Sequence, residues 1–333
     1  MNNLYIKKPL VPLTNIQKTK DILKELTLEN IINQFDEFKY KCFNSPTNIF
    51  WKIDYLLPKL FMTKYGQINF KYTISTNDTI HDDGSNDSPY HFRIRKIKQD
   101  KLIKQTYKLS NNDIYENLHF TEMDCENDLW AKPPALVLDY GRLNKPNQSI
   151  LYTSMEGSTT LTECNINVNE YFFIICYKRI KPITFSDCYR FIAFNELTEE
   201  ENSKRYIIFN LLKNEFVRIF PKTYYEYEQC QYCISSKIAE YFFINDNVDG
   251  IQYPSVKNIG AFNFAFKGIS ARECLNPVCI KFCKLLKPIN GKKGTSEILT
   301  NGFWQNNKFI WTTPESSLSK KLSDISLGMY LYK

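Results

Sequence analysis

The chain has 333 residues, and 43 Lys and Arg against 36 Asp and Glu give it a formal net charge of +7. With 43% hydrophobic residues, including 24 Phe and 22 Tyr, it can bury a large core, which excludes an intrinsically disordered chain. The small basic excess lies in scattered lysines, so nucleic acid is not implied as the main partner. No run reaches the roughly 18 apolar residues of a membrane-spanning helix, and the N-terminus lacks a signal-peptide pattern. We therefore expect a soluble cytoplasmic protein with reduced thiols and no membrane partner.

The N-terminal part of the chain has helical patterns. Thr14 with Gln17 three residues later fits a capping box, which predicts a helix over residues 15–26. A second helix is predicted to begin near Thr27. Apolar residues at helical spacing place one face of it toward a core: Leu28, Ile31, Ile32 and Phe35.

A polar stretch interrupts the chain after these helices. Residues 76–89 are rich in Asn, Asp, Ser and Thr, which is typical of a solvated loop or linker. We therefore place a boundary near residue 86. This divides the chain into an N-terminal helical accessory region with a polar linker (1–85), a main domain (86–290) and a C-terminal extension (291–333).

Strand-like and helical patterns mix irregularly in the main domain. We expect strands at 135–139, 149–153 and 171–177, and helices at 204–218 and 224–243. Strands and helices do not alternate as a doubly wound sheet requires, so an α+β fold is predicted. Aromatic segments on either side of Asn306-Asn307 predict a hairpin in the C-terminal extension.

Several common chemistries lack their motifs. The three histidines, His81, His91 and His119, do not form a helical zinc pair, and there is neither a P-loop nor a G-x-G-x-x-G sequence. Cys230-x-x-Cys233 can be half of a zinc site, but its neighbours share a helical face, so we expect buried free thiols and no metal. The lysines at 281, 284, 287, 292 and 293 are expected on a solvated face, with a partner patch as the alternative.

A strand-like segment carries two arginines. In residues 90–95, alternation on a strand would send Arg93 and Arg95 to the same face. Two adjacent guanidinium groups repel each other unless an anion lies between them, and a pyrophosphate matches their geometry. The simpler interpretation is a solvent-facing edge strand.

Two further segments combine polar residues with turns and strands. In the first, a Gly-Arg-x-Asn turn at 141–144 precedes Tyr152, and Ser158 is positioned to cap a short helix that carries Glu163. In the second, Ser255 ends an Asp-Gly-Ile-x-Tyr-x-Ser run, and Asn263 follows it. Read alone, each of these residues can be structural.

Together and in this order, the segments resemble the RES family, which is named for an Arg, a Glu and a Ser spaced along its domain. Its members consume NAD, and many are toxins of toxin-antitoxin pairs. The likeness spans about residues 89–270. The matching pieces are Phe92-Arg93, Gly-Arg-x-Asn at 141–144, Leu151-Tyr152, Thr-x-x-Glu at 160–163, Asp-Gly-Ile-x-Tyr-x-Ser at 249–255, and Asn263.

The resemblance implies a core like that of ADP-ribosylating toxins, with mostly antiparallel sheets and helices around a cleft. It also implies cleavage of the nicotinamide–ribose bond of NAD as a substrate, without a tightly bound cofactor. Nicotinamide leaves as a neutral group from a cationic ring, so no general acid is needed, while the ribose becomes oxocarbenium-like. In this scheme Glu163 stabilises the ribose, and the ring of Tyr152 packs on the nicotinamide end.

The remaining family positions would bind the rest of the dinucleotide. Arg93 and Arg142 would hold its phosphates, with Arg95 as the alternative to Arg93, while Ser255 and Asn263 would bind the dinucleotide by hydrogen bonds. The catalytic set implied is thus Glu163, Arg93 and Tyr152.

The acceptor of ADP-ribose is left open by the sequence. Inorganic phosphate, as in an NAD phosphorylase, water, and a protein side chain are the three candidates. Two non-enzymatic alternatives are a silent module that binds ADP-ribose, NAD or a partner, and a single-stranded nucleic-acid binder. An enzyme that depletes NAD needs restraint, so we expect an antitoxin or other inhibitory protein, a sensor, or the N-terminal helices lying over the cleft.

Overall fold

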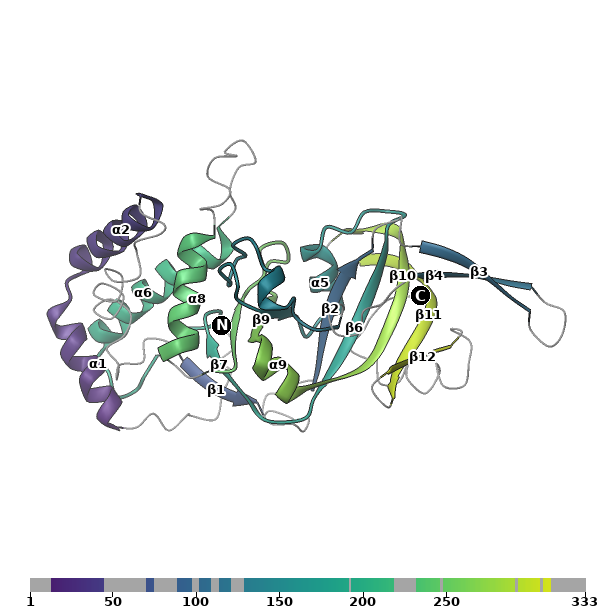
Figure 1. Ribbon diagram of the computed structural model, residues 1–333. Coiled ribbons are helices and arrows are strands. Elements are labelled where there is room, and N and C mark those ends of the chain that lie inside the picture. The colour runs from purple at the N-terminus through teal and green to yellow at the C-terminus, as the bar shows by residue number, and fades with distance from the viewer. Residues whose placement is uncertain are drawn as a thin grey trace.

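The fold is α+β, as the sequence predicts, and is built on two five-stranded sheets (Figure 1). It is taken from a computed structural model. The residues that the structure describes are 13–44, 70–74, 89–97, 102–108, 114–120, 129–191, 193–218, 232–245, 248–290, 293–305 and 308–312. Six α-helices lie within these ranges.

One sheet is mixed and lies at the centre of the molecule. Its strands, in spatial order, are β1 (Phe70–Ile74), β7 (Ile183–Asp187), β8 (Gly250–Pro254), β9 (Phe262–Lys267) and β5 (Ile150–Thr153). The strands β7 and β8 are parallel, and the other neighbours are antiparallel.

The other sheet is antiparallel throughout. Its strands, in spatial order, are β12 (Lys308–Thr312), β11 (Lys293–Gln305), β10 (Leu275–Asn290), β6 (Tyr171–Arg179) and β2 (Tyr90–Lys96). Pairing of β11 with β12 confirms the predicted C-terminal hairpin. A separate two-stranded ribbon, β3 (Leu102–Lys108) with β4 (Ile114–Phe120), extends beyond this sheet in Figure 1.

The two sheets enclose a common hydrophobic core. Every second residue of β6, including Phe173 and Ile175, packs against apolar residues of the mixed sheet such as Phe264 and Phe266. The other face of β6 is buried too, which explains its continuous apolar sequence. At one edge, Phe92 of β2 and Ser154 exchange two main-chain hydrogen bonds of 2.7 and 2.9 Å, which join β2 to the end of β5.

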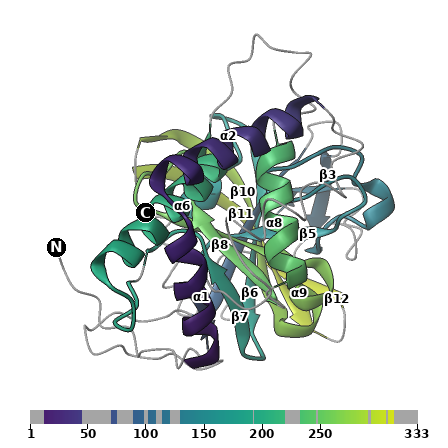
Figure 2. The same ribbon diagram turned by 90° about the vertical axis from the view of Figure 1, so that its left-hand side faces the viewer.

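Four helices cover the opposite face of the mixed sheet, as Figures 1 and 2 show. They are α1 (Leu13–Glu25), α2 (Leu28–Asn44), α6 (Glu199–Val217) and α8 (Cys233–Asn245). Their buried side chains form one core with Ile251 and Ala265 of the sheet. On α2, the predicted apolar face is only half right. Ile31 and Phe35 are buried, whereas Leu28 and Ile32 are 48% and 47% exposed.

Other predictions of local structure need correction. The run 135–139 is not a strand: residues Pro134–Leu136 form a short 3₁₀ helix, because proline has no N–H for a sheet ladder. Thr14 lies inside α1 and is not its cap residue. Lys281 lies on the central strand β10 and is 8% exposed, so it is not on a solvated face. Strands β5 and β6 and helices α1 and α6 agree with the predictions.

The sheets cross the divisions expected at residues 85 and 290. Strand β1 precedes the first division and pairs with β7, and β11 follows the second and pairs with β10. Within the described ranges, no helix has the length and apolar character that a membrane span requires.

Candidate active site

Glu163 ends the short helix α5 (Gly157–Glu163), which contacts β2, β9 and β10. The cap residue of α5 is Glu156, so the prediction that Ser158 caps the helix is wrong. Leu161 packs with Phe92 in the core beneath the antiparallel sheet. Residues two apart on a helix point in nearly opposite directions. Burial of Leu161 therefore turns Glu163 toward the mixed sheet.

Three donors from the mixed sheet bind one oxygen of Glu163. Its Oε1 accepts hydrogen bonds from Ser255 Oγ (2.5 Å), Val256 N (2.9 Å) and Asn263 Nδ2 (3.1 Å). Ser255 and Asn263 are each 6% exposed, so these donors are fixed in the interior. Among the described residues nothing donates to Oε2 of this half-buried side chain.

The loop that follows β8 orients the Ser255 hydroxyl. The main-chain N–H of Asn258 donates to Ser255 Oγ (3.0 Å), so the serine proton points to Glu163. The side-chain amide of Asn258 donates to Thr159 on α5 (2.8 Å). The end of the loop is fixed by Tyr189, whose hydroxyl donates to the carbonyl of Gly260 (2.6 Å). Gly260 has φ +87°, a conformation that glycine adopts without strain.

Tyr152 lies on β5, and its hydroxyl is held by the Gly-Arg-x-Asn turn. It accepts a hydrogen bond from Leu143 N (3.0 Å) and donates to Asn144 Oδ1 (2.8 Å). Burial raises the pKa of Tyr152 far above its ordinary value, and the bond from Leu143 opposes this rise only in part. The Tyr152 phenol is therefore neutral, and its ring packs against the core under the helices.

Arg142 has a role at the end of a helix. Its Nη1 donates to the carbonyls of Phe216 (2.5 Å) and Arg218 (3.3 Å), which end α6. The guanidinium also lies 5.2 Å from the ring centroid of Tyr232. A cation stabilises the negative end of a helix dipole, so Arg142 supports α6 whatever else it binds.

Tyr253 on β8 connects the two halves of the site. This side chain is 6% exposed, and burial raises the pKa of its phenol. The charge of Glu163 raises this pKa further, whereas Arg142 lowers it. Tyr253 packs in one core with Tyr152. It also pairs across β8 and β9 with Asn263, which binds Glu163.

The arginines of β2 leave the strand on the face opposite to Phe92 and Ile94, which share a core with Leu161 of α5. Arg93 Nη1 donates to the carbonyls of Leu129 (3.0 Å) and Trp130 (2.5 Å). Burial raises the pKa of the Cys164 thiol to about 11, and the charge of Arg93 opposes this rise. Arg93 and Arg95 both lower the pKa of Tyr177, as expected for neighbours on one face of a strand.

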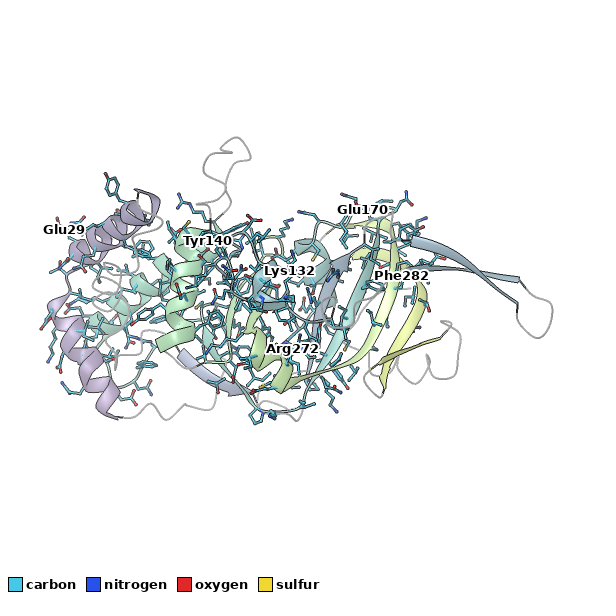
Figure 3. The ribbon with its side chains drawn as sticks, in the orientation of Figure 1. Glu29, Lys132, Tyr140, Glu170, Arg272 and Phe282 are labelled. Carbon is cyan, nitrogen blue, oxygen red and sulfur yellow. The ribbon has the colours of Figure 1, made fainter. Side chains whose placement is uncertain are left out.

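The structure therefore brings Ser255 and Asn263 into direct contact with Glu163, and Tyr152 packs in one core with Tyr253, the strand partner of Asn263. Arg142 binds the end of α6, whereas Arg93 binds the carbonyls of Leu129 and Trp130 and shares a strand face with Arg95. Joint binding of one pyrophosphate by these arginines stays a prediction. In Figure 3, Tyr140, next to the turn, lies toward α8, and Phe282 marks the antiparallel sheet on the opposite side.

Some residues of the site, and some roles, were not visible in the sequence. Tyr253 belongs to the Asp-Gly-Ile-x-Tyr-x-Ser run but was given no role there. The contact between Asn258 and Thr159 is not visible in the sequence, because it joins distant segments. The Asp-Gly pair of the run at 249–255 is structural. Asp249 accepts a hydrogen bond from Thr184 N (2.9 Å), and a Cβ on Gly250 would lie 2.7 Å from the Phe185 ring.

Among the described side chains, Cys233, Cys274, Cys279 and Cys283 are free thiols and are buried. Cys230 lies outside the described residues. Within the described part of the chain, no three His, Cys, Asp or Glu side chains are grouped so that they could hold a metal ion.

Fold and site together define an α+β protein in which a glutamate on a short helix is fixed by donors from a mixed sheet. No protein-family model matches the sequence, and no curated protein is detectably similar to it. The resemblance to the RES family thus depends on the sequence motifs.

Proposed function

We propose that the protein cleaves the bond between nicotinamide and ribose in NAD, as RES enzymes do. The observation that carries the proposal is the setting of Glu163, whose Oε1 accepts three hydrogen bonds from donors on or next to the mixed sheet. A carboxylate fixed in this way stabilises the positive charge that develops on the ribose as nicotinamide leaves.

The surrounding residues support the same reaction. The ring of Tyr152 packs in one core with Tyr253, whose strand partner Asn263 binds Glu163, and an aromatic face attracts the pyridinium of bound NAD. In this proposal the guanidinium groups of Arg142 and Arg93 bind the two phosphates. Two packed sheets with α5 at their junction are compatible with an ADP-ribosyltransferase-like core, which is part of this proposal.

Ser255 has a more specific role in this scheme than the resemblance implies. Its hydroxyl donates to Glu163, and the proton that it would offer to the dinucleotide is already used. Ser255 and Asn263 therefore act as positioning residues for the carboxylate.

Incubation of the purified protein with NAD tests the proposal and identifies the acceptor. Products are resolved with and without inorganic phosphate, and with a protein mixture as a third acceptor. Free ADP-ribose indicates water, a phosphorylated ADP-ribose indicates phosphate, and labelled polypeptide indicates a protein. Absence of nicotinamide release from folded protein under all three conditions overturns the proposal. NAD binding in calorimetry without turnover would instead identify a silent binding module.

Restraint of this activity is part of the proposal, because depletion of NAD is toxic. Helices α1 and α2 pack on the helical side of the mixed sheet with α6 and α8. An antitoxin or another inhibitory protein thus suits the role better than these helices. Expression of the active protein alone should arrest growth, and the Glu163→Gln variant should not.

A further inference from the structure

The hydroxyl of Tyr152 is fixed within the protein. Its proton goes to Asn144 Oδ1 at 2.8 Å, and it accepts the N–H of Leu143 at 3.0 Å. Because the phenol is also neutral, it has no proton to exchange with a substrate at ordinary pH. Only the ring of Tyr152 remains to contact a ligand, so what matters for NAD is the orientation of that ring.

Asn144 is itself held rigidly. It is 7% exposed, and its Nδ2 donates to the carbonyls of Lys145 (3.3 Å) and Asp139 (3.4 Å). Its main-chain carbonyl accepts the N–H of Gly141 at 2.9 Å, which closes the turn. A Cβ on Gly141 would lie 2.2 Å from Asn144 Oδ1, so the glycine leaves room for the amide oxygen that binds Tyr152.

We propose that Asn144 is a positioning residue that holds the ring of Tyr152 in place for the nicotinamide end of NAD. This inference rests on the proposed function. A phenol attached at two points, Leu143 N and Asn144 Oδ1, cannot tilt freely about its Cβ. Loss of one attachment lets the ring move, and small displacements of a positioning group reduce catalysis substantially.

A double-mutant cycle on the full chain tests whether Asn144 acts through the Tyr152 hydroxyl. The variants are Asn144→Ala, Tyr152→Phe and the double variant, with Asn33→Ala on the exposed face of α2 as control. Nicotinamide release is measured as kcat and KM. Each single variant should lower kcat/KM about tenfold, mainly through a higher KM. The double variant should be no worse than the singles, because both remove the same hydrogen bond. Asn33→Ala should match the wild type.

A multiplicative loss of about a hundredfold in the double variant would overturn the inference, because Asn144 would then act through the stability of the turn alone. Thermal unfolding of each variant identifies those that do not fold. If the Asn144→Ala variant does not fold, Asn144→Ser, which retains a polar residue in the turn, replaces it in the same cycle. If the wild-type protein releases no nicotinamide, both the proposed function and this inference are wrong. If the wild type is active but the effects of the two substitutions on kcat/KM multiply, only this inference is wrong.

Discussion

At the scale of single residues, Glu163 is carried by one part of the molecule and fixed by another. Its helix packs on the antiparallel sheet, whereas all three donors to Oε1 belong to β9 and to the loop between β8 and β9. The carboxylate therefore has a defined position only when the two sheets are packed. The contribution of each donor can therefore be tested by a single substitution.

Replacement of Ser255 by alanine removes one donor to Glu163 without adding bulk. Hydrogen bonds to charged groups contribute roughly 1.5–3 kcal/mol, so we expect kcat for nicotinamide release to fall at least about tenfold. Ser158→Ala, the same change on α5 away from the carboxylate, is the matched control and should leave kcat unchanged. Equal activity of Ser255→Ala and wild type would show that this donor does not position Glu163.

The sequence permits prediction of which residues gather but not of what each one binds. Glu163, Ser255 and Asn263 could be proposed as a set from their order alone. The partner of Ser255 could not, because it depends on where the loop after β8 meets α5. Arg142 illustrates the same limit, since the carbonyls that it binds lie more than seventy residues away at the end of α6.

At the scale of elements, hydrogen bonds stabilise helix α6 at both of its ends. Its first turn has a capping box, in which Thr198 Oγ1 accepts from Glu201 N (3.2 Å) and Glu201 Oε2 accepts from Thr198 N (2.8 Å). Its last carbonyls bind Arg142, next to the turn that holds Tyr152. Stability of α6 and order in the turn are therefore connected.

Thr198→Ala removes this cap. Loss of a threonine cap costs about 1 kcal/mol, so the free energy of unfolding in urea should fall by about that amount. Thr198→Ser keeps the hydroxyl and should remain close to wild type. A similar loss in both variants would mean that packing of the threonine methyl, and not the cap, is what stabilises the helix.

Helices and strands with a clear hydrophobic pattern in their own sequence were predictable. Those whose burial depends on pairing with another strand were not. The apolar run of β6 and the spacing of α1 and α6 are visible in sequence. The long strand β10 is not, because its three lysines suggest a solvated surface, and only its place between β6 and β11 buries Lys281. The run 135–139 has the composition of a strand, but it begins within the 3₁₀ helix Pro134–Leu136.

At the scale of the whole molecule, packing of the two sheets depends on a buried histidine. His91 on β2 is 0% exposed, and its ring lies edge-on to Phe264 and Phe266 of the mixed sheet at 4.9 and 5.1 Å. Burial, assisted by the charge of Arg179, lowers the pKa of His91 well below 6.5. The folded protein therefore keeps His91 neutral under conditions in which the unfolded chain protonates it.

This difference predicts a loss of stability in mild acid. As pH falls through about 6.5, the unfolded state binds a proton that the folded state does not. Each further pH unit then lowers the free energy of unfolding by up to about 1.4 kcal/mol. His91→Leu removes this contribution. The deficit of the variant relative to wild type, measured by urea unfolding, should therefore shrink between pH 7.5 and pH 5. A deficit that is constant over this range would contradict the assignment of a buried neutral His91.

The central claim is that the Glu163 carboxylate stabilises the ribose as nicotinamide leaves NAD. The most direct measurement is the rate of nicotinamide release by wild type and by Glu163→Gln, which keeps the shape of the side chain and removes its charge. Loss of one preorganised group of this kind lowers the rate by about 10² to 10³. We predict a loss of that size, with Ser158→Ala unaffected. Turnover of Glu163→Gln at the wild-type rate would contradict the account.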